Sequence, residues 1–144
     1  MEQTSRHETA IRAMIDDWRS ALRARDAEAL LAHYAPDFLS FDLAPPLRTR
    51  GPDLAGTKAW LATWRGPIEL DVADLHVEVD GGLAYSTSLN RIRGIKTNGT
   101  EIDLWVRATI GYRNKGGRWK VAHEHISVPF RMDGSERAAL DLQP

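Results

Sequence analysis

The second half of the chain consists of four long runs of strand-forming residues, and this feature limits the possible folds more than any other. The runs cover residues 68–80, 83–95, 100–113 and 118–128. They are separated by three glycine-containing turns: Asp80-Gly81-Gly82, Asn98-Gly99 and Lys115-Gly116-Gly117. Such turns favour hairpins because glycine and asparagine adopt the positive φ angles that a tight turn requires. The sequence therefore predicts an antiparallel meander of four strands.

The first 66 residues mostly show helical spacing instead. Ser5 and Glu8 are spaced as a capping box, and the helix predicted after them has an apolar face formed by Ile11, Ile15, Trp18 and Leu22. Asp26 is the predicted N-cap of a short second helix, which ends before Pro36 and carries Leu30, Leu31 and Tyr34. After a short strand at residues 38–43, a third helix is predicted to begin at Pro52-Asp53 and to carry Leu54, Trp60, Leu61 and Trp64. The pattern predicts an α+β fold with three N-terminal helices packed on one face of a curved sheet.

Composition excludes several classes of protein. The 144 residues fit one domain, and the formal net charge of −1 provides no basic surface for nucleic acid or for an anionic membrane. No apolar run approaches the roughly 20 residues of a membrane-spanning helix. The chain has no cysteine, and its polar N-terminus lacks the apolar middle of a signal peptide. We therefore expect a cytoplasmic protein that binds neither nucleic acid nor a membrane.

Two segments carry a resemblance to a known family: DAEALLAHYAPDFLSFD (residues 26–42) and GGRWKVAHEHIS (residues 116–127). With these segments the chain resembles the nuclear transport factor 2-like superfamily, and within it the SnoaL-like and ketosteroid-isomerase-like proteins. The resemblance implies a single domain over residues 1–130, followed by a C-terminal tail at 131–144 with few apolar anchors. It also implies a cone, in which a curved antiparallel or mixed sheet and three N-terminal helices enclose a pocket. Many members of this superfamily form homodimers through the outer face of the sheet.

The resemblance places the general base of the steroid isomerases at Asp42, the end of the first strand. The tyrosine of their oxyanion hole corresponds to Trp18, and their second donor, a protonated aspartate, falls near Ala108. An oxyanion hole needs hydrogen-bond donors directed at the developing charge. Since two of the three catalytic groups differ, the sequence does not predict steroid isomerase activity.

The last predicted strand contains His123-Glu124-His125, and strand geometry separates these three residues. Side chains alternate between the two faces, so Glu124 lies on the face of Ile126 while both histidines lie on the face of Trp119 and Val121. Alignment with the last strand of the family directs Glu124 and Ile126 toward the pocket and the histidines outward. A β-bulge would reverse this assignment.

Two sites follow from these faces, and the two are compatible. The first is a pair of pocket carboxylates, Asp42 and Glu124, that divide acid and base chemistry. Its substrate-binding residues are predicted to be Trp18, Tyr34, Trp60, Trp64, Ala108, Ile110 and Ile126. The second is a polar network on the outer face, at a homodimer interface, formed by Trp105, Arg107, His123 and His125. As a purely structural alternative, Glu124 pairs with an arginine, either Arg91 or Arg107.

The sequence predicts no metal and no cofactor. His123 and His125 point the same way, but a third ligand is required, and His76 or Asp103 supplies it only in a favourable register. The chain has no phosphate-binding loop and no nucleophilic triad. We therefore expect a small-molecule-binding protein for a small apolar organic ligand, with possible roles as a cofactor-independent isomerase, cyclase or hydratase. The alternative is a non-catalytic ligand-binding or homodimeric association module.

Overall fold

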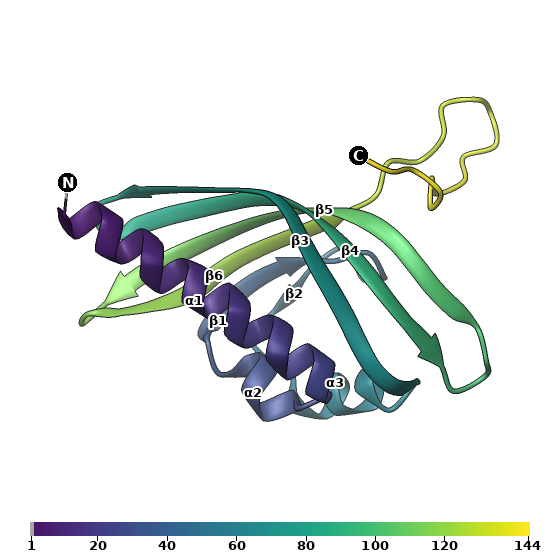
Figure 1. Cartoon of the computed structure of the whole chain (residues 1–144), viewed down its shortest axis with the longest axis horizontal. Coiled ribbons are helices and arrows are strands. Elements are labelled where there is room, and N and C mark those ends of the chain that lie inside the picture. The colour runs from purple at the N-terminus through teal and green to yellow at the C-terminus, as the bar shows by residue number, and fades with distance from the viewer. Residues whose placement is uncertain (1) are drawn as a thin grey trace.

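The computed structural model describes residues 2–144 and shows a long helix lying across a curved, open sheet (Figure 1). The helices are α1 (Glu2–Ala24), α2 (Ala27–Leu31) and α3 (Leu54–Leu61). The strands are β1 (Tyr34–Phe41), β2 (Thr49–Arg50), β3 (Trp64–Asp80), β4 (Leu83–Lys96), β5 (Glu101–Lys115) and β6 (Arg118–Ser127). Their order in the sheet is β2-β1-β6-β5-β4-β3, with β1 and β6 parallel and all other pairs antiparallel. The predicted α+β class, the four-strand meander and the curved mixed sheet are confirmed.

Several predicted boundaries are wrong, and each has a local cause. The first helix begins at Glu2, ahead of the predicted capping box at Ser5. Tyr34 belongs to β1 and not to the second helix, because the backbone there pairs with β6: the Val121 amide donates to the His33 carbonyl at 2.8 Å. Trp64 opens β3, since the third helix ends at Leu61.

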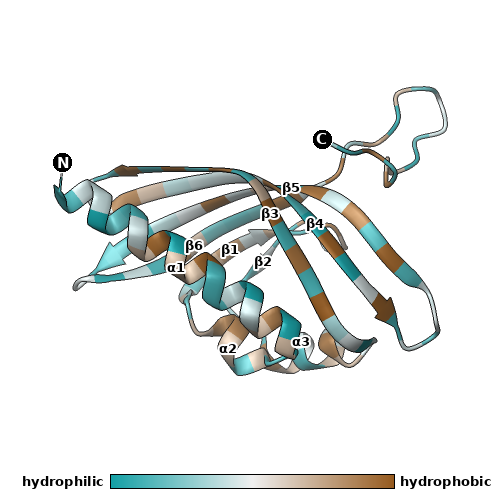
Figure 2. Ribbon diagram, viewed as in Figure 1, coloured by the Kyte–Doolittle hydropathy of each residue, from teal (hydrophilic) through white to brown (hydrophobic). Residues whose placement is uncertain are grey.

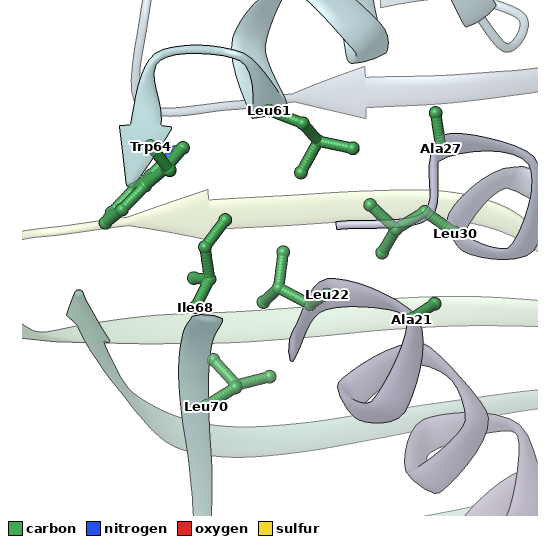
Figure 3. Close-up of a cluster of buried hydrophobic side chains, with 8 residues drawn as sticks. All are labelled: Ala21, Leu22, Ala27, Leu30, Leu61, Trp64, Ile68 and Leu70. Carbon is green, nitrogen blue, oxygen red and sulfur yellow. The ribbon is translucent and has the colours of Figure 1, made fainter. Parts of the chain in front are cut away.

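The α1 helix is held in place by two apolar clusters. Near its C-terminal end, Ala21 and Leu22 pack against α2, α3 and the start of β3 (Figure 3). Near its N-terminal end, Ile11 and Met14 pack against the inward side chains of the sheet, which include Val77, Tyr112, Trp119 and Val121. Ile11 is 0% exposed, and burial of such a side chain contributes about 1.5–3 kcal/mol. The helix therefore covers the concave face of the sheet, and apolar and polar residues alternate along the strands beneath it (Figure 2).

A β-bulge at Ala122 determines which side chains of β6 point inward. The pairing of β5 with β6 shifts between Gly111↔His123 and Tyr112↔Val121, so Ala122 has no opposite residue. Because one residue is inserted, Trp119 and Val121 face inward before the bulge, and Glu124 and Ile126 face inward after it. Simple alternation predicted that Trp119 and Val121 lie on the same face as the two histidines. This prediction is wrong because the bulge inserts one residue between them.

Residues 131–144 fold back on the end of the domain. Phe130 and Ala138 form an isolated antiparallel bridge, and the Ala139 amide donates to the Pro129 carbonyl at 2.8 Å. Ala139 is buried, while Met132 is 89% exposed. The segment thus has its own backbone hydrogen bonds, although few of its side chains are covered. Within residues 2–144, no helix is both long enough and apolar enough to cross a membrane.

Candidate functional site

The centre of the candidate site is Glu124 of β6, on the concave face. Its two carboxylate oxygens accept hydrogen bonds from the Tyr34 hydroxyl at 2.8 Å and from the Ser40 hydroxyl at 3.0 Å. Ser40 lies directly opposite Glu124 in the parallel pair of β1 and β6, which explains why the two side chains meet. Sequence reasoning did not include Ser40 in the site. The sequence feature that could have placed it there is the alternation along the first strand, which puts Ser40 on the same face as Phe38.

Burial of the Glu124 carboxyl raises its pKa above the usual value for a glutamate. The nearby charge of Asp42 acts in the same direction, whereas the hydrogen bonds from Tyr34 and Ser40 and the charge of His123 lower the pKa. The residue as a whole is half-buried, so part of its surface is exposed. Glu124 is therefore a carboxyl group that takes up a proton more readily than an ordinary glutamate, on a residue that is not fully covered by the protein.

Tyr34 connects Glu124 to the helix above the sheet. Burial and the adjacent Glu124 carboxylate raise the pKa of the phenol well above its usual value, and the nearby Trp18 indole opposes this effect. The ring of Phe38 lies 4.4 Å from the ring of Tyr34, centroid to centroid, and limits its movement. The phenol therefore keeps its proton and acts as a fixed donor to Glu124.

Asp42 lies at the rim of the same face. β1 ends at Phe41, and the Asp42 side chain is exposed, with its carboxylate accepting from the Leu43 amide at 2.7 Å. Its charge raises the pKa values of both Glu124 and Tyr34. The two predicted carboxylates are thus near each other, one half-buried and the other in contact with solvent.

Apolar side chains form the floor beside Glu124. Ile110 pairs with Glu124 across β5 and β6, and Ala108 pairs with Ile126 in the next row. Ala108 is 3% exposed, while Ile110 and Ile126 are half-buried. Of the predicted substrate-binding residues, Tyr34 and Ile110 therefore lie directly beside Glu124, and Ala108 and Ile126 form the next row of the same face.

Trp60 and Trp64 lie at the other end of the fold. Trp64 is buried in the cluster formed by α1, α2, α3 and β3, and Trp60 is 43% exposed. The Lys96 ammonium lies 4.0 Å from the centroid of the Trp64 ring and 5.8 Å from that of Trp60. Trp18 packs against the same cluster as Trp64, so these two predicted residues share one apolar cluster, while Trp60 lies largely at the surface beside Trp64.

The convex face carries the second predicted group of residues. The rings of His123 and His125 contact the edge of the Phe41 ring at centroid distances of 5.0 and 5.4 Å. The His123 Nδ1 atom lies 2.7 Å from the Leu39 carbonyl oxygen, which accepts when Nδ1 carries the proton. Arg107 donates to the Ser127 hydroxyl, so neither it nor Arg91, which pairs with Asp103, is the partner of Glu124.

Two hollows of the structure lie outside the concave face. An open groove of about 560 Å³ is lined by Arg25, Asp26, Lys58 and neighbouring residues of the three helices. A small hollow of about 70 Å³ lies between the convex face at Trp105 and the C-terminal residues 140–143. Within the described residues 2–144, no group of three histidine, aspartate or glutamate side chains is arranged to hold a metal ion.

Comparison with known proteins identifies the family. The model of the SnoaL-like domain matches residues 11–131, and the chain belongs to this family. A nuclear transport factor 2-like protein of unknown function from Pseudomonas putida is 35% identical, with a TM-score of 0.87 over 98% of this chain and 99% of that one. No curated protein sequence matches the chain.

More distant structures share the fold. A proposed dehydratase of the nuclear transport factor 2-like family from Streptomyces avermitilis is 18% identical, with a TM-score of 0.75, over 86% of this chain and 97% of that one. A proposed aromatic ring hydroxylase from Novosphingobium aromaticivorans is 17% identical, with a TM-score of 0.70, over 83% and 86% of the two chains. At these identities the likeness concerns the fold, and the function must be argued from the site.

Proposed function

We propose that the protein binds a small, largely apolar organic molecule on the concave face and exchanges a proton with it through Glu124. The observation that carries this proposal is the Glu124 carboxyl itself, with its raised pKa, two fixed hydroxyl donors and remaining access to solvent. A carboxyl group whose pKa lies closer to neutrality is a more effective general acid or base than an ordinary one.

The surroundings of Glu124 support a cofactor-independent reaction of the isomerase, cyclase or hydratase type. The apolar floor of Ala108, Ile110 and Ile126 favours a carbon skeleton, and Tyr34 holds the carboxyl in one orientation. Asp42 is the second carboxylate of the proposed pair. Because it is exposed at the rim, it suits proton transfer to and from solvent, while Glu124 acts on the ligand.

Chemical-shift mapping with 4-phenylphenol and 2-tetralone tests ligand binding. We expect the perturbed residues to cluster on the concave face, around Glu124 and Ile110. Perturbations confined to the groove between the helices, or to the convex face, would contradict the proposed site.

Proton exchange tests the acid–base role. The α-protons of 2-tetralone should exchange into D2O faster in the presence of the protein, and the rate should increase with pH as Glu124 loses its proton. Glu124→Gln should abolish this acceleration, because an amide does not accept the proton. Asp103→Asn, on the convex face, is the matched control and should leave the rate unchanged. Acceleration that persists in the Glu124→Gln variant would refute the assignment.

A second function, homodimeric association, rests on the convex face. The cluster of Phe41, His123 and His125 places three rings on a surface that no helix covers. Sedimentation tests this association, and a protein that is monomeric at both acidic and neutral pH would contradict it.

A further inference from the structure

A second polar group lies on the concave face of β4. Ser86 and Ile92 of this strand face inward, since Ser86 contacts the buried Tyr112 and Ile92 packs against the core. The pairing of β4 with β5 is regular from end to end, so Ser88 and Asn90 share that face. Both residues are half-buried and therefore accessible to a ligand.

The two side chains are joined to each other. The Ser88 hydroxyl donates to the Asn90 Oδ1 atom at 2.8 Å. This bond uses the carbonyl oxygen of the amide and fixes its orientation, and it leaves the two N–H groups of Nδ2 for another partner. The pair therefore presents hydrogen-bond donors, without a charge, to the space above the sheet.

The register places this pair at a defined distance from Glu124. Ser86, Ile110 and Glu124 form one row across the sheet, and Ser88, Ala108 and Ile126 form the next. From strand spacing and rise per residue, the Cα atom of Glu124 lies about 12 Å from that of Ser88 and about 16 Å from that of Asn90 along a flat sheet, and curvature shortens both distances. The inward residues between the two polar groups are Ala108, Ile110 and Ile126, with Val106 directly opposite Asn90, and all four are apolar.

We propose that Ser88 and Asn90 form a second recognition site on the concave face, for a neutral hydrogen-bond acceptor at the far end of the ligand. This inference rests on the proposed function and specifies its ligand class. The ligand is an elongated apolar molecule with one polar group at Glu124 and a carbonyl or carboxamide oxygen at Asn90. A neutral acceptor fits because the donors are amide N–H groups, and the arginines of β4, Arg91 and Arg93, point to the other face and pair with Asp103 and Asp71.

Two probes that differ only at the far end test this inference by isothermal titration calorimetry. The first is 4-phenylphenol, and the second is 4′-hydroxybiphenyl-4-carboxamide, which adds the acceptor. We expect the carboxamide to bind about tenfold more tightly, the value of one good hydrogen bond. In Asn90→Leu and Asn90→Asp the two probes should bind with about equal affinity, because both variants lack the N–H donors.

Ser88→Ala and Thr87→Ala form a matched pair, since Thr87 lies next to Ser88 but on the convex face. Ser88→Ala should reduce the preference for the carboxamide, and Thr87→Ala should preserve it. Two results would refute the second site and leave the proposed function standing. Either 4-phenylphenol binds in a Glu124-dependent way and the carboxamide binds no more tightly, or the carboxamide still binds more tightly than 4-phenylphenol in both Asn90 variants. If neither probe binds, or if Glu124→Gln leaves both affinities unchanged, the proposed function fails and the second site fails with it.

Discussion

Replacement of Glu124 by glutamine should remove a pH dependence from the free energy of unfolding. Glu124 has a raised pKa in the folded protein, so between the unfolded value of about 4.3 and the folded value, the folded chain holds a proton that the unfolded chain has released. In that interval the wild-type protein loses stability as the pH increases. The glutamine side chain keeps an acceptor for Tyr34 and a polar contact for Ser40 but does not titrate.

The size of the effect follows from the difference between the two pKa values. Each unit by which the folded pKa exceeds the unfolded one is worth about 1.4 kcal/mol. The stability of the wild type relative to Glu124→Gln should therefore decline by that amount per unit as the pH rises above about 4.3, and then level off above the folded pKa. Urea denaturation between about pH 4.5 and pH 8, followed by the fluorescence of the five tryptophans, measures it.

Asp103 provides a control of opposite sign. Its hydrogen bonds with Arg91 lower the pKa of this exposed carboxyl, so the stability it contributes is lost only as the pH falls below about 4. The difference between the wild type and Asp103→Asn should therefore stay constant between about pH 5 and pH 8. If the wild-type and Glu124→Gln curves also remain parallel from about pH 4.5 upward, burial does not raise the pKa of Glu124.

Three further substitutions test the packing and the hydrogen bonds. Tyr34→Phe removes one donor to Glu124 and should destabilise the protein by about 1–3 kcal/mol at pH 8. The loss should be smaller at about pH 4, where a carboxyl with a raised pKa holds its proton, and equal losses at both values in urea denaturation would contradict this. Ile11→Ala should cost about 2–5 kcal/mol in the same assay because the side chain is fully buried, and a loss below about 1 kcal/mol would mean that α1 is not packed as described. Gly94→Ala would place a Cβ atom 2.8 Å from the Trp64 ring and should cost about 1–3 kcal/mol, whereas Gly82→Ala, whose Cβ would meet nothing closer than 3.8 Å, is the control and should be nearly neutral.

The fold could be predicted from the sequence because its signals are local. The glycine turns at Gly81-Gly82, Gly99 and Gly116-Gly117 fix the hairpins of the meander, and the spacing of Ile11 to Leu22 fixes the face of the first helix. The inward direction of Glu124 came from the family alignment. Alternation alone would have grouped it with Lys120 and Ala122.

The remaining features depend on contacts between distant residues. The bulge at Ala122 leaves no mark in the local sequence, because it reflects how β6 fits between β1 and β5. Tyr34 was placed in a helix because its strand pairing involves residues about 90 positions away. Trp18, Trp60 and Trp64 were grouped because all three come from the helical half of the sequence. Trp18 does pack against the cluster that contains Trp64, whereas the approach of Lys96 to Trp60 and Trp64 depends on β4, which is distant in the sequence.

The proposed acid–base role depends above all on Glu124, a concave-face carboxyl whose pKa is raised by burial. The most direct measurement is an NMR titration of the side-chain carboxyl carbons in a 13C-glutamate-labelled protein, with the Glu124 signal identified by its absence from the Glu124→Gln spectrum. We expect a midpoint above that of an ordinary glutamate, and a further increase in Tyr34→Phe, which lacks one hydrogen bond that stabilises the carboxylate. A midpoint at or below the ordinary value would contradict it.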